Sequence, residues 1–118
     1  MIIGTPEEIP GKQDQGYHGG HGSYLVRTLL EKIPSSAFEH CRYIVLHCGT
    51  SIGDHLHTIN EEILFIISGH GTVQVDGEER KVSAGAGILN LPGSHHSLPN
   101  EGEGDLELFV VCATALKV

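Results

Sequence analysis

Short runs of apolar and β-branched residues alternate with turns rich in glycine, proline and asparagine along most of the chain. Such runs predict short β-strands, because these residues favour strands and the residues between them favour tight turns. The segment "TVQVDGEERKV" predicts a hairpin that turns at Asp76-Gly77. The other strands are predicted at residues 23–30, 41–48, 62–68, 87–91, 95–98 and 106–116, with a short segment at 55–57. Roughly eight to ten short strands without strand–helix alternation indicate an all-β sandwich or barrel.

The length of 118 residues suits one domain with a hydrophobic core. Residues 1–22 are polar and glycine-rich, which predicts an irregular N-terminal arm with at most one short strand. The barrel is therefore assigned to residues 23–118. Residues 31–40 form a connection that Pro34 interrupts, and a short helix stays open as an alternative there and at the C-terminus.

Acidic residues outnumber basic ones by 15 to 7, which gives a formal charge of −8. This balance argues against nucleic acid and against an anionic membrane surface as partners. The longest apolar run, residues 63–67, is too short to cross a bilayer, and the N-terminus lacks the pattern of a signal peptide. We therefore expect a cytoplasmic protein. The odd number of cysteines without a CxxC pair predicts reduced thiols, interpreted as small buried hydrophobes at Cys41, Cys48 and Cys112.

Two histidines and a glutamate are spaced as metal ligands in the stretch "GDHLHTINEE". Side chains at positions i and i+2 of a strand share one face, so His55 and His57 can reach one point. Glu62 opens the next predicted strand after a short turn. Two imidazoles and a carboxylate suit a divalent transition metal such as Mn, Fe, Co, Ni or Zn. A fourth ligand would come from elsewhere, and His95 and His96 are the candidates.

This stretch lies within a longer motif that resembles the first motif of the cupin superfamily. That motif consists of glycine, five residues, His-x-His, three or four residues, glutamate, six residues and glycine. The same order and spacing run here from Gly49 to Gly69. The six-residue spacing to Gly69 selects Glu62 rather than Glu61.

A second stretch resembles the second cupin motif, which is glycine, five residues, Pro-x-Gly, two residues, histidine, three residues and asparagine. It runs here from Gly85 to Asn100, with the proline moved one place to Pro92. The spacing selects His96 over His95. The resemblance implies a single-domain jelly-roll β-barrel that holds a divalent metal (Fe, Mn, Ni or Zn) through four side chains: His55, His57, Glu62 and His96.

Strand alternation predicts which residues line the interior near this site. With Glu62 inward, Leu64 and Ile66 follow it, whereas residues 63, 65 and 67 face the other way. Arg27 and Arg42 are candidates to bind an anion, and each could equally lie on an exposed sheet face. Asn60 and Tyr43 are weaker candidates. Among the other histidines, His18 and His21 are expected in solvent, His95 is expected to face away from the metal, and His47 is interpreted as a strand or supporting histidine.

The resemblance implies a metal-dependent protein acting on a small molecule, and the open coordination positions favour a dioxygenase. Two alternatives stay open: a non-catalytic module that binds or senses a small ligand, and a metal-dependent isomerase, lyase or decarboxylase. The segment "YLVRTLL" is apolar on both faces and needs cover from both sides. We therefore predict a homodimer with residues 1–30 contributing to the interface.

Overall fold

The computed structural model describes residues 1–56 and 58–115. Within these residues the only helical element is a short 3₁₀ turn, and the rest of the regular structure is β-strand. The elements follow the order β1 (Lys12–Gln15), η1 (Tyr17–Gly19), β2 (Ser23–Glu31), β3 (Phe38–Leu46), β4 (Ser51–Leu56), β5 (Asn60–Ser68), β6 (His70–Val75), β7 (Glu78–Ser83), β8 (Gly87–Asn90), β9 (His95–Pro99) and β10 (Leu106–Thr114).

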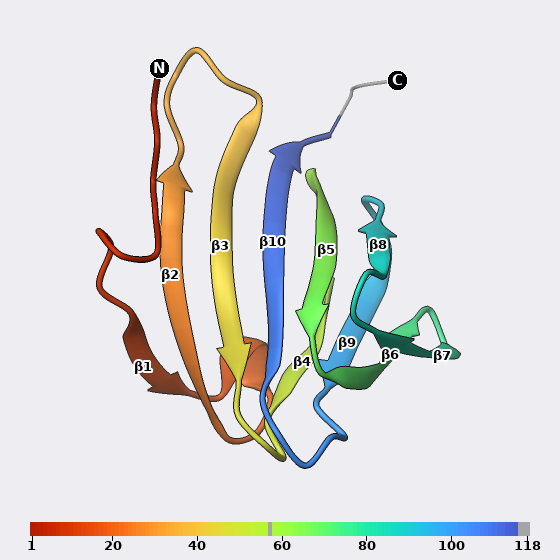
Figure 1. The fold of residues 1–118 in the computed structure, drawn as a ribbon. Helices are drawn as coiled ribbons and strands as arrows, with labels where there is room; N and C mark the ends of the chain where they lie inside the picture. The colour runs from red at the N-terminus through yellow and green to blue at the C-terminus, as the bar shows by residue number, and fades with distance from the viewer. Residues whose placement is uncertain (57, 116–118) are drawn as a thin grey trace.

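The strands form two sheets that lie one behind the other (Figure 1). The first sheet has the order β1-β2-β3-β10-β5-β8 and the second has the order β4-β9-β6-β7. All pairings between these strands are antiparallel, and several join strands that are far apart in sequence, as in a jelly roll. The predicted all-β jelly-roll architecture is confirmed.

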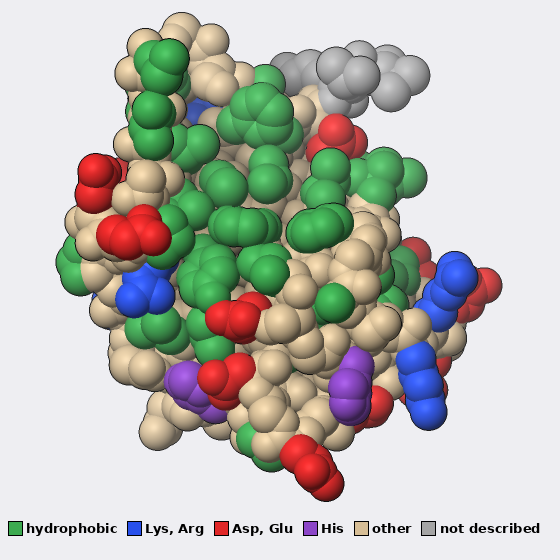
Figure 2. Space-filling model, in the orientation of Figure 1, with side chains coloured by type: hydrophobic (Ala, Val, Ile, Leu, Met, Phe, Trp, Pro, Cys, Tyr) green, Lys and Arg blue, Asp and Glu red, His purple; other side chains and the backbone are tan. Residues whose placement is uncertain are grey.

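Alternate residues of β5, β9 and β10 fill the interior, in the period of two that the sequence predicts for a strand. Leu64 and Ile66 on β5 are fully buried, whereas Phe65 between them is 45% exposed. Figure 2 shows hydrophobic side chains gathered on the outward face of the six-stranded sheet, over β2, β3, β10 and β5. One face of this sheet therefore makes the core, and the other presents an apolar surface.

The inner face of the six-stranded sheet changes character along the strands. Near the centre of the sheet, Val110 lies opposite Leu64 on β5 and opposite Arg42 on β3. At the next inward position, Cys112 lies opposite Glu62 and His40. The inner face thus passes from apolar side chains to a row of polar side chains near one end of the sandwich.

The observed strands differ from the predicted ones mainly at their ends. β3 begins at Phe38 rather than at residue 41, because its first residues pair with the last residues of β10. β10 ends at Thr114, and residues 116–118 lie outside the described residues. The connection at 31–40 contains a turn and no helix. The segment 1–22 contributes β1, which pairs with β2 at the edge of the six-stranded sheet.

Turn chemistry agrees with the sequence at two tight turns. Asp76 and Gly77 both have positive φ angles, 47° and 84°, and they join β6 to β7 as predicted. After β8, the Ser94 amide donates a hydrogen bond to the Leu91 carbonyl at 3.2 Å, and Gly93 has a φ of 87°. Proline followed by a glycine of positive φ is typical of a type II turn. The displaced Pro92 therefore fits this turn.

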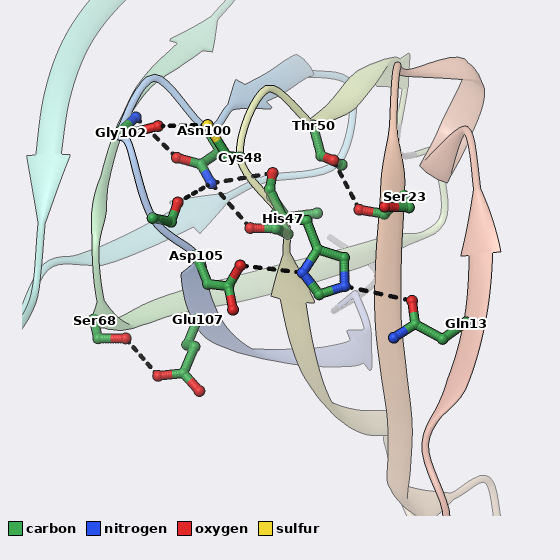
Figure 3. A network of polar contacts seen from close by, with 12 residues as sticks. Gln13, Ser23, His47, Cys48, Thr50, Ser68, Asn100, Gly102, Asp105 and Glu107 are labelled. Atoms are coloured by element: carbon green, nitrogen blue, oxygen red, sulfur yellow. Dashed lines mark hydrogen bonds and ion pairs between the residues drawn. The ribbon is translucent and has the colours of Figure 1, made fainter.

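The Asn100 side chain links the loop between β9 and β10 to the end of β3 through hydrogen bonds (Figure 3). Its side-chain amide donates to the carbonyls of Leu46 at 2.9 Å and Gly104 at 2.9 Å, and the His47 carbonyl lies 3.2 Å away. Its side-chain oxygen accepts a hydrogen bond from the Gly102 amide at 2.9 Å. The asparagine is 5% exposed, so these bonds satisfy buried backbone groups.

Candidate metal centre

Three of the four predicted ligands converge where the two sheets meet. His55 on β4 lies opposite His96 on β9 in the four-stranded sheet, and Glu62 comes from β5 in the other sheet. The ligand atoms of these three side chains all lie within 4.8 Å of one another, and the Glu62 carboxylate is 3.3 Å from Nε2 of His96. Ligand atoms of one divalent ion are at most about 4.2 Å apart, so a small contraction brings this set to coordination distance.

The geometry of His55 fits a metal ligand because one of its ring nitrogens already has a hydrogen-bond partner. Nδ1 of His55 lies 2.9 Å from the backbone carbonyl of Gly53, which can only accept a hydrogen bond. Nδ1 therefore carries the proton, and the lone pair is on Nε2. This arrangement, in which a carbonyl fixes the tautomer of a ligating histidine, is common at metal sites.

Two of the three side chains are buried, and His55 is half-buried. Glu62 is 7% exposed and His96 is 1% exposed, so a carboxylate sits in the interior close to two imidazoles. Asn90 lies opposite Glu62 on β8 and is fully buried. Within the described part of the chain, neither polar atom of the Asn90 side chain has a hydrogen-bond partner. Buried polar groups normally have a hydrogen-bond partner. The three candidate ligands and the neighbouring Asn90 therefore suit a bound ion whose coordinated oxygen atoms would bond to the Asn90 side chain.

The fourth predicted ligand, His57, lies outside the described residues. The four-residue ligand set therefore stays a prediction. Its members His55, Glu62 and His96 lie close together in the structure. As expected from strand alternation, His95 is exposed while His96 is buried.

A pocket of about 300 Å³ opens beside Glu62 and His55. Arg42 lines it, and Nη1 of Arg42 is 3.4 Å from the hydroxyl of Tyr17. Burial raises the pKa of Tyr17, and the nearby Arg42 only partly offsets that effect, so the hydroxyl keeps its proton. The pocket thus offers a cation and a hydroxyl donor next to the candidate metal ligands.

The N-terminal segment forms part of this pocket, which the sequence analysis did not anticipate. His18 is exposed as predicted, yet its ring stacks on the ring of His55 with centroids 4.0 Å apart. The segment can approach because Gly53 lacks a side chain: a Cβ there would meet the His18 carbonyl oxygen at 2.3 Å. Glycines at 16, 19 and 20 around Tyr17 and His18 were the available signal of a chain folded tightly against a neighbour.

The other candidates divide between the pocket and the remaining surface. Asn60 lines the pocket. Arg27 instead donates from Nε to the carbonyl of Ile9 at 3.1 Å, and the Tyr43 hydroxyl bonds to Glu107. Arg42 is therefore the arginine that the fold brings to the candidate site.

The cysteines depart from their interpretation as uniformly buried hydrophobes. Cys112 is buried, Cys41 is half-buried and Cys48 is exposed, and all three are free thiols. Cys48 is exposed because it follows the end of β3 in a turn. Burial, and to a smaller extent the charge of Glu62, raises the pKa of Cys112 to about 11. The Cys112 thiol also forms a second group of possible metal ligands with His40 and Glu62, a feature that the sequence analysis missed.

Comparison with known proteins agrees with this fold. A family model described as Cupin domain matches residues 42–112. An oxalate-binding protein of Thermotoga maritima is 32% identical over 113 residues, which cover 94% of this chain and 92% of the relative. A crystal structure described as a predicted oxalate decarboxylase, also from Thermotoga maritima, has a TM-score of 0.91 at 28% identity and covers 98% of this chain and 100% of its own.

A more distant structure supports the fold alone. KdgF from Halomonas sp. has a TM-score of 0.80 at 14% identity, over 99% of this chain and 96% of its own. Within the described residues, no helix is both long and apolar enough to traverse a membrane.

Proposed function

Because the chain belongs to the cupin domain family, we propose that it uses a divalent transition metal to bind a small dicarboxylate of the oxalate class. The name of the Thermotoga maritima relative supports the ligand class, and the pocket of about 300 Å³ lies at the small end of the range for ligand sites. A dianion also suits a site in which a divalent ion and an arginine supply positive charge.

In this proposal the metal is held by His55, Glu62 and His96, with His57 as the fourth ligand that the resemblance implies. The ion is one of Mn, Fe, Ni or Zn, since imidazole and carboxylate ligands accept all four. When bound, it supplies Lewis acidity and a point of attachment for carboxylate oxygens. The protein supplies the buried positions of Glu62 and His96 and the fixed tautomer of His55.

The observation that carries the proposal is Arg42. Its Nε atom is buried and makes no hydrogen bond to any of the residues that the structure describes. A guanidinium group presents its donors in a planar fork that matches a carboxylate, and a carboxylate would meet this unused donor. Arg42 and the Tyr17 hydroxyl therefore bind the carboxylate end that the metal does not hold.

The test is calorimetric titration of oxalate into the Mn(II)-loaded protein. We expect Arg42→Gln to weaken binding by about 10–100-fold, the equivalent of one lost charge-assisted hydrogen bond. Arg27→Gln is the matched control, because Arg27 lies on the neighbouring strand outside the pocket and should leave affinity unchanged. His96→Ala should lower both metal content and oxalate binding. Wild-type affinity in Arg42→Gln would refute the proposal.

Turnover of the bound dicarboxylate is the second candidate function, and the position of His18 favours it. An imidazole at the exposed mouth of the pocket, stacked on His55, is placed to transfer protons between solvent and ligand. Decarboxylation of oxalate breaks the carbon–carbon bond, releases CO₂ and requires one proton on the remaining carbon to give formate.

The dioxygenase reaction predicted from the open coordination positions is the competing form of turnover. An oxygen electrode combined with formate and CO₂ assays on the Fe(II), Mn(II) and Ni(II) forms separates the two, with Glu62→Ala as the inactive control. Formate and CO₂ without oxygen uptake indicate a decarboxylase, and oxygen uptake with oxalate, an enol or a keto acid indicates a dioxygenase. Binding without turnover in every metal form leaves a ligand-binding protein.

A further inference from the structure

We propose that His40, Cys112 and Glu62 form a second ligand set, which binds a thiophilic divalent cation of the zinc class. This set shares only Glu62 with the set of His55, Glu62 and His96, and it goes beyond the proposed function. The chain then has two neighbouring metal sites, one with a sulfur ligand and one with nitrogen and oxygen ligands alone.

The register of the six-stranded sheet places the three side chains in one row. Cys112 on β10 lies opposite His40 on β3 and opposite Glu62 on β5, so β10 carries the central member. The three inward side chains share one face of the sheet, and their ligand atoms all lie within 4.8 Å of one another. This convergence follows from strand pairing in the sheet and needs no loop to hold it.

Burial makes the set suitable for a dehydrated ion. Cys112 is 2% exposed and Glu62 is 7% exposed, while His40 is half-buried and lines the pocket through which an ion can enter. An N, S and O ligand set leaves a fourth tetrahedral position for water, as in zinc sites with three protein ligands. The negative charges of Glu62 and of the Cys112 thiolate offset the positive charge of the nearby Arg42.

Ligand softness separates the two sets. Thiolate favours Zn²⁺ and similar soft cations, whereas the histidine and carboxylate set also accepts Mn²⁺ and Fe²⁺. On binding, the Cys112 thiol forms a bond from sulfur to the metal and releases its proton to solvent. Because Glu62 belongs to both sets, its removal weakens both.

Titration of the chelator-treated, reduced protein with Co²⁺ tests the site, because only a thiolate ligand produces a sulfur-to-cobalt charge-transfer band in the near ultraviolet. We expect the wild-type protein to show this band and Cys112→Ser to lose it. Cys41→Ser and Cys48→Ser are the matched controls and should keep it. His40→Ala, a change at a half-buried position, should weaken Co²⁺ binding at this band by more than about tenfold.

The same spectra distinguish this site from the proposed function. His96→Ala should lose oxalate binding in the Mn²⁺ form while keeping the charge-transfer band. Absence of the band from the wild-type protein, its persistence in Cys112→Ser, or its loss from the Cys41 or Cys48 variants would overturn the assignment. If Cys112→Ser does not fold, as judged by circular dichroism, His40→Ala decides: an unchanged band and affinity refute the site.

Discussion

Replacing Asn100 by aspartate tests whether this motif asparagine stabilises the fold at the end away from the candidate metal site. The substitution keeps the shape of the side chain, so it creates no cavity. It exchanges an amide that donates to the carbonyls of Leu46 and Gly104 for a carboxylate oxygen that can only accept. The bond from the Gly102 amide to the side-chain oxygen stays available.

The expected loss follows from these contacts. The buried carbonyl of Leu46 and the partly buried carbonyl of Gly104 lose their side-chain donor, and an unsatisfied buried group costs about 1–3 kcal/mol. A third carbonyl, that of His47, lies 3.2 Å from the same atom and adds repulsion toward an ionised oxygen. We therefore expect Asn100→Asp to lower the free energy of unfolding by about 3–5 kcal/mol. For a domain of this length, that corresponds to a fall in Tm of roughly 12–20 °C.

Urea and thermal unfolding of the metal-free protein at neutral pH measure this loss without a contribution from bound metal. Gln15→Glu is the control for the added negative charge, because Gln15 is exposed on the edge strand β1. It should change stability by less than about 0.5 kcal/mol. A loss below about 1 kcal/mol in Asn100→Asp would show that solvent or rearranged backbone satisfies these carbonyls, and would refute the role assigned to the asparagine.

Three further changes probe other parts of the molecule. A hydrogen bond from Ser68 is the main cause of the lowered pKa of Glu107, so the ionised carboxylate favours folding. In urea unfolding at neutral pH, Glu107→Gln should lower the free energy of unfolding by less than about 1 kcal/mol. The difference from the wild-type protein should vanish once acid has protonated the carboxylate, and a loss that does not depend on pH would contradict this. Gly53→Ala should displace the segment around His18 from β4, because the added Cβ would clash with the His18 carbonyl oxygen. We expect faster proteolysis within residues 12–22, and an unchanged cleavage pattern would contradict this contact. Phe65→Glu on the exposed apolar sheet face should convert the predicted homodimer to a monomer in light scattering at tens of micromolar, and a monomeric wild-type protein would contradict the dimer.

The sequence predicted the features that depend on local pattern. Strand alternation placed Leu64 and Ile66 inside, and turn residues placed the hairpin at Asp76-Gly77. The spacing of the motifs selected Glu62 and His96 as candidate ligands. The fold brings the Glu62 carboxylate to 3.3 Å from Nε2 of His96, and their role as metal ligands stays a prediction. The alternation and turn predictions succeeded because side-chain direction along a strand and the backbone angles of a tight turn are set by residues close in sequence.

Features that depend on pairing between distant strands were not predictable in the same way. The placement of Cys112 beside His40 follows from the register of β10 against β3, which no local pattern encodes. The approach of Tyr17 and His18 to the site also depends on tertiary contacts of a polar, glycine-rich segment. Similarly, the choice between Arg27 and Arg42 required the sheet itself, since both arginines lie within otherwise apolar strands.

The segregation of polar and apolar rows on the inner sheet face has a consequence for divergence within such a fold. Glu62 and Leu64 are adjacent inward positions of the same strand, yet one lies in the candidate site and the other in the core. Substitutions confined to the polar row should alter the ion and ligand preferences proposed for this site while leaving the hydrophobic layers intact. Descendants of one ancestral sandwich can therefore acquire new specificities without passing through unfolded intermediates, and laboratory libraries restricted to this row should retain a high fraction of folded members.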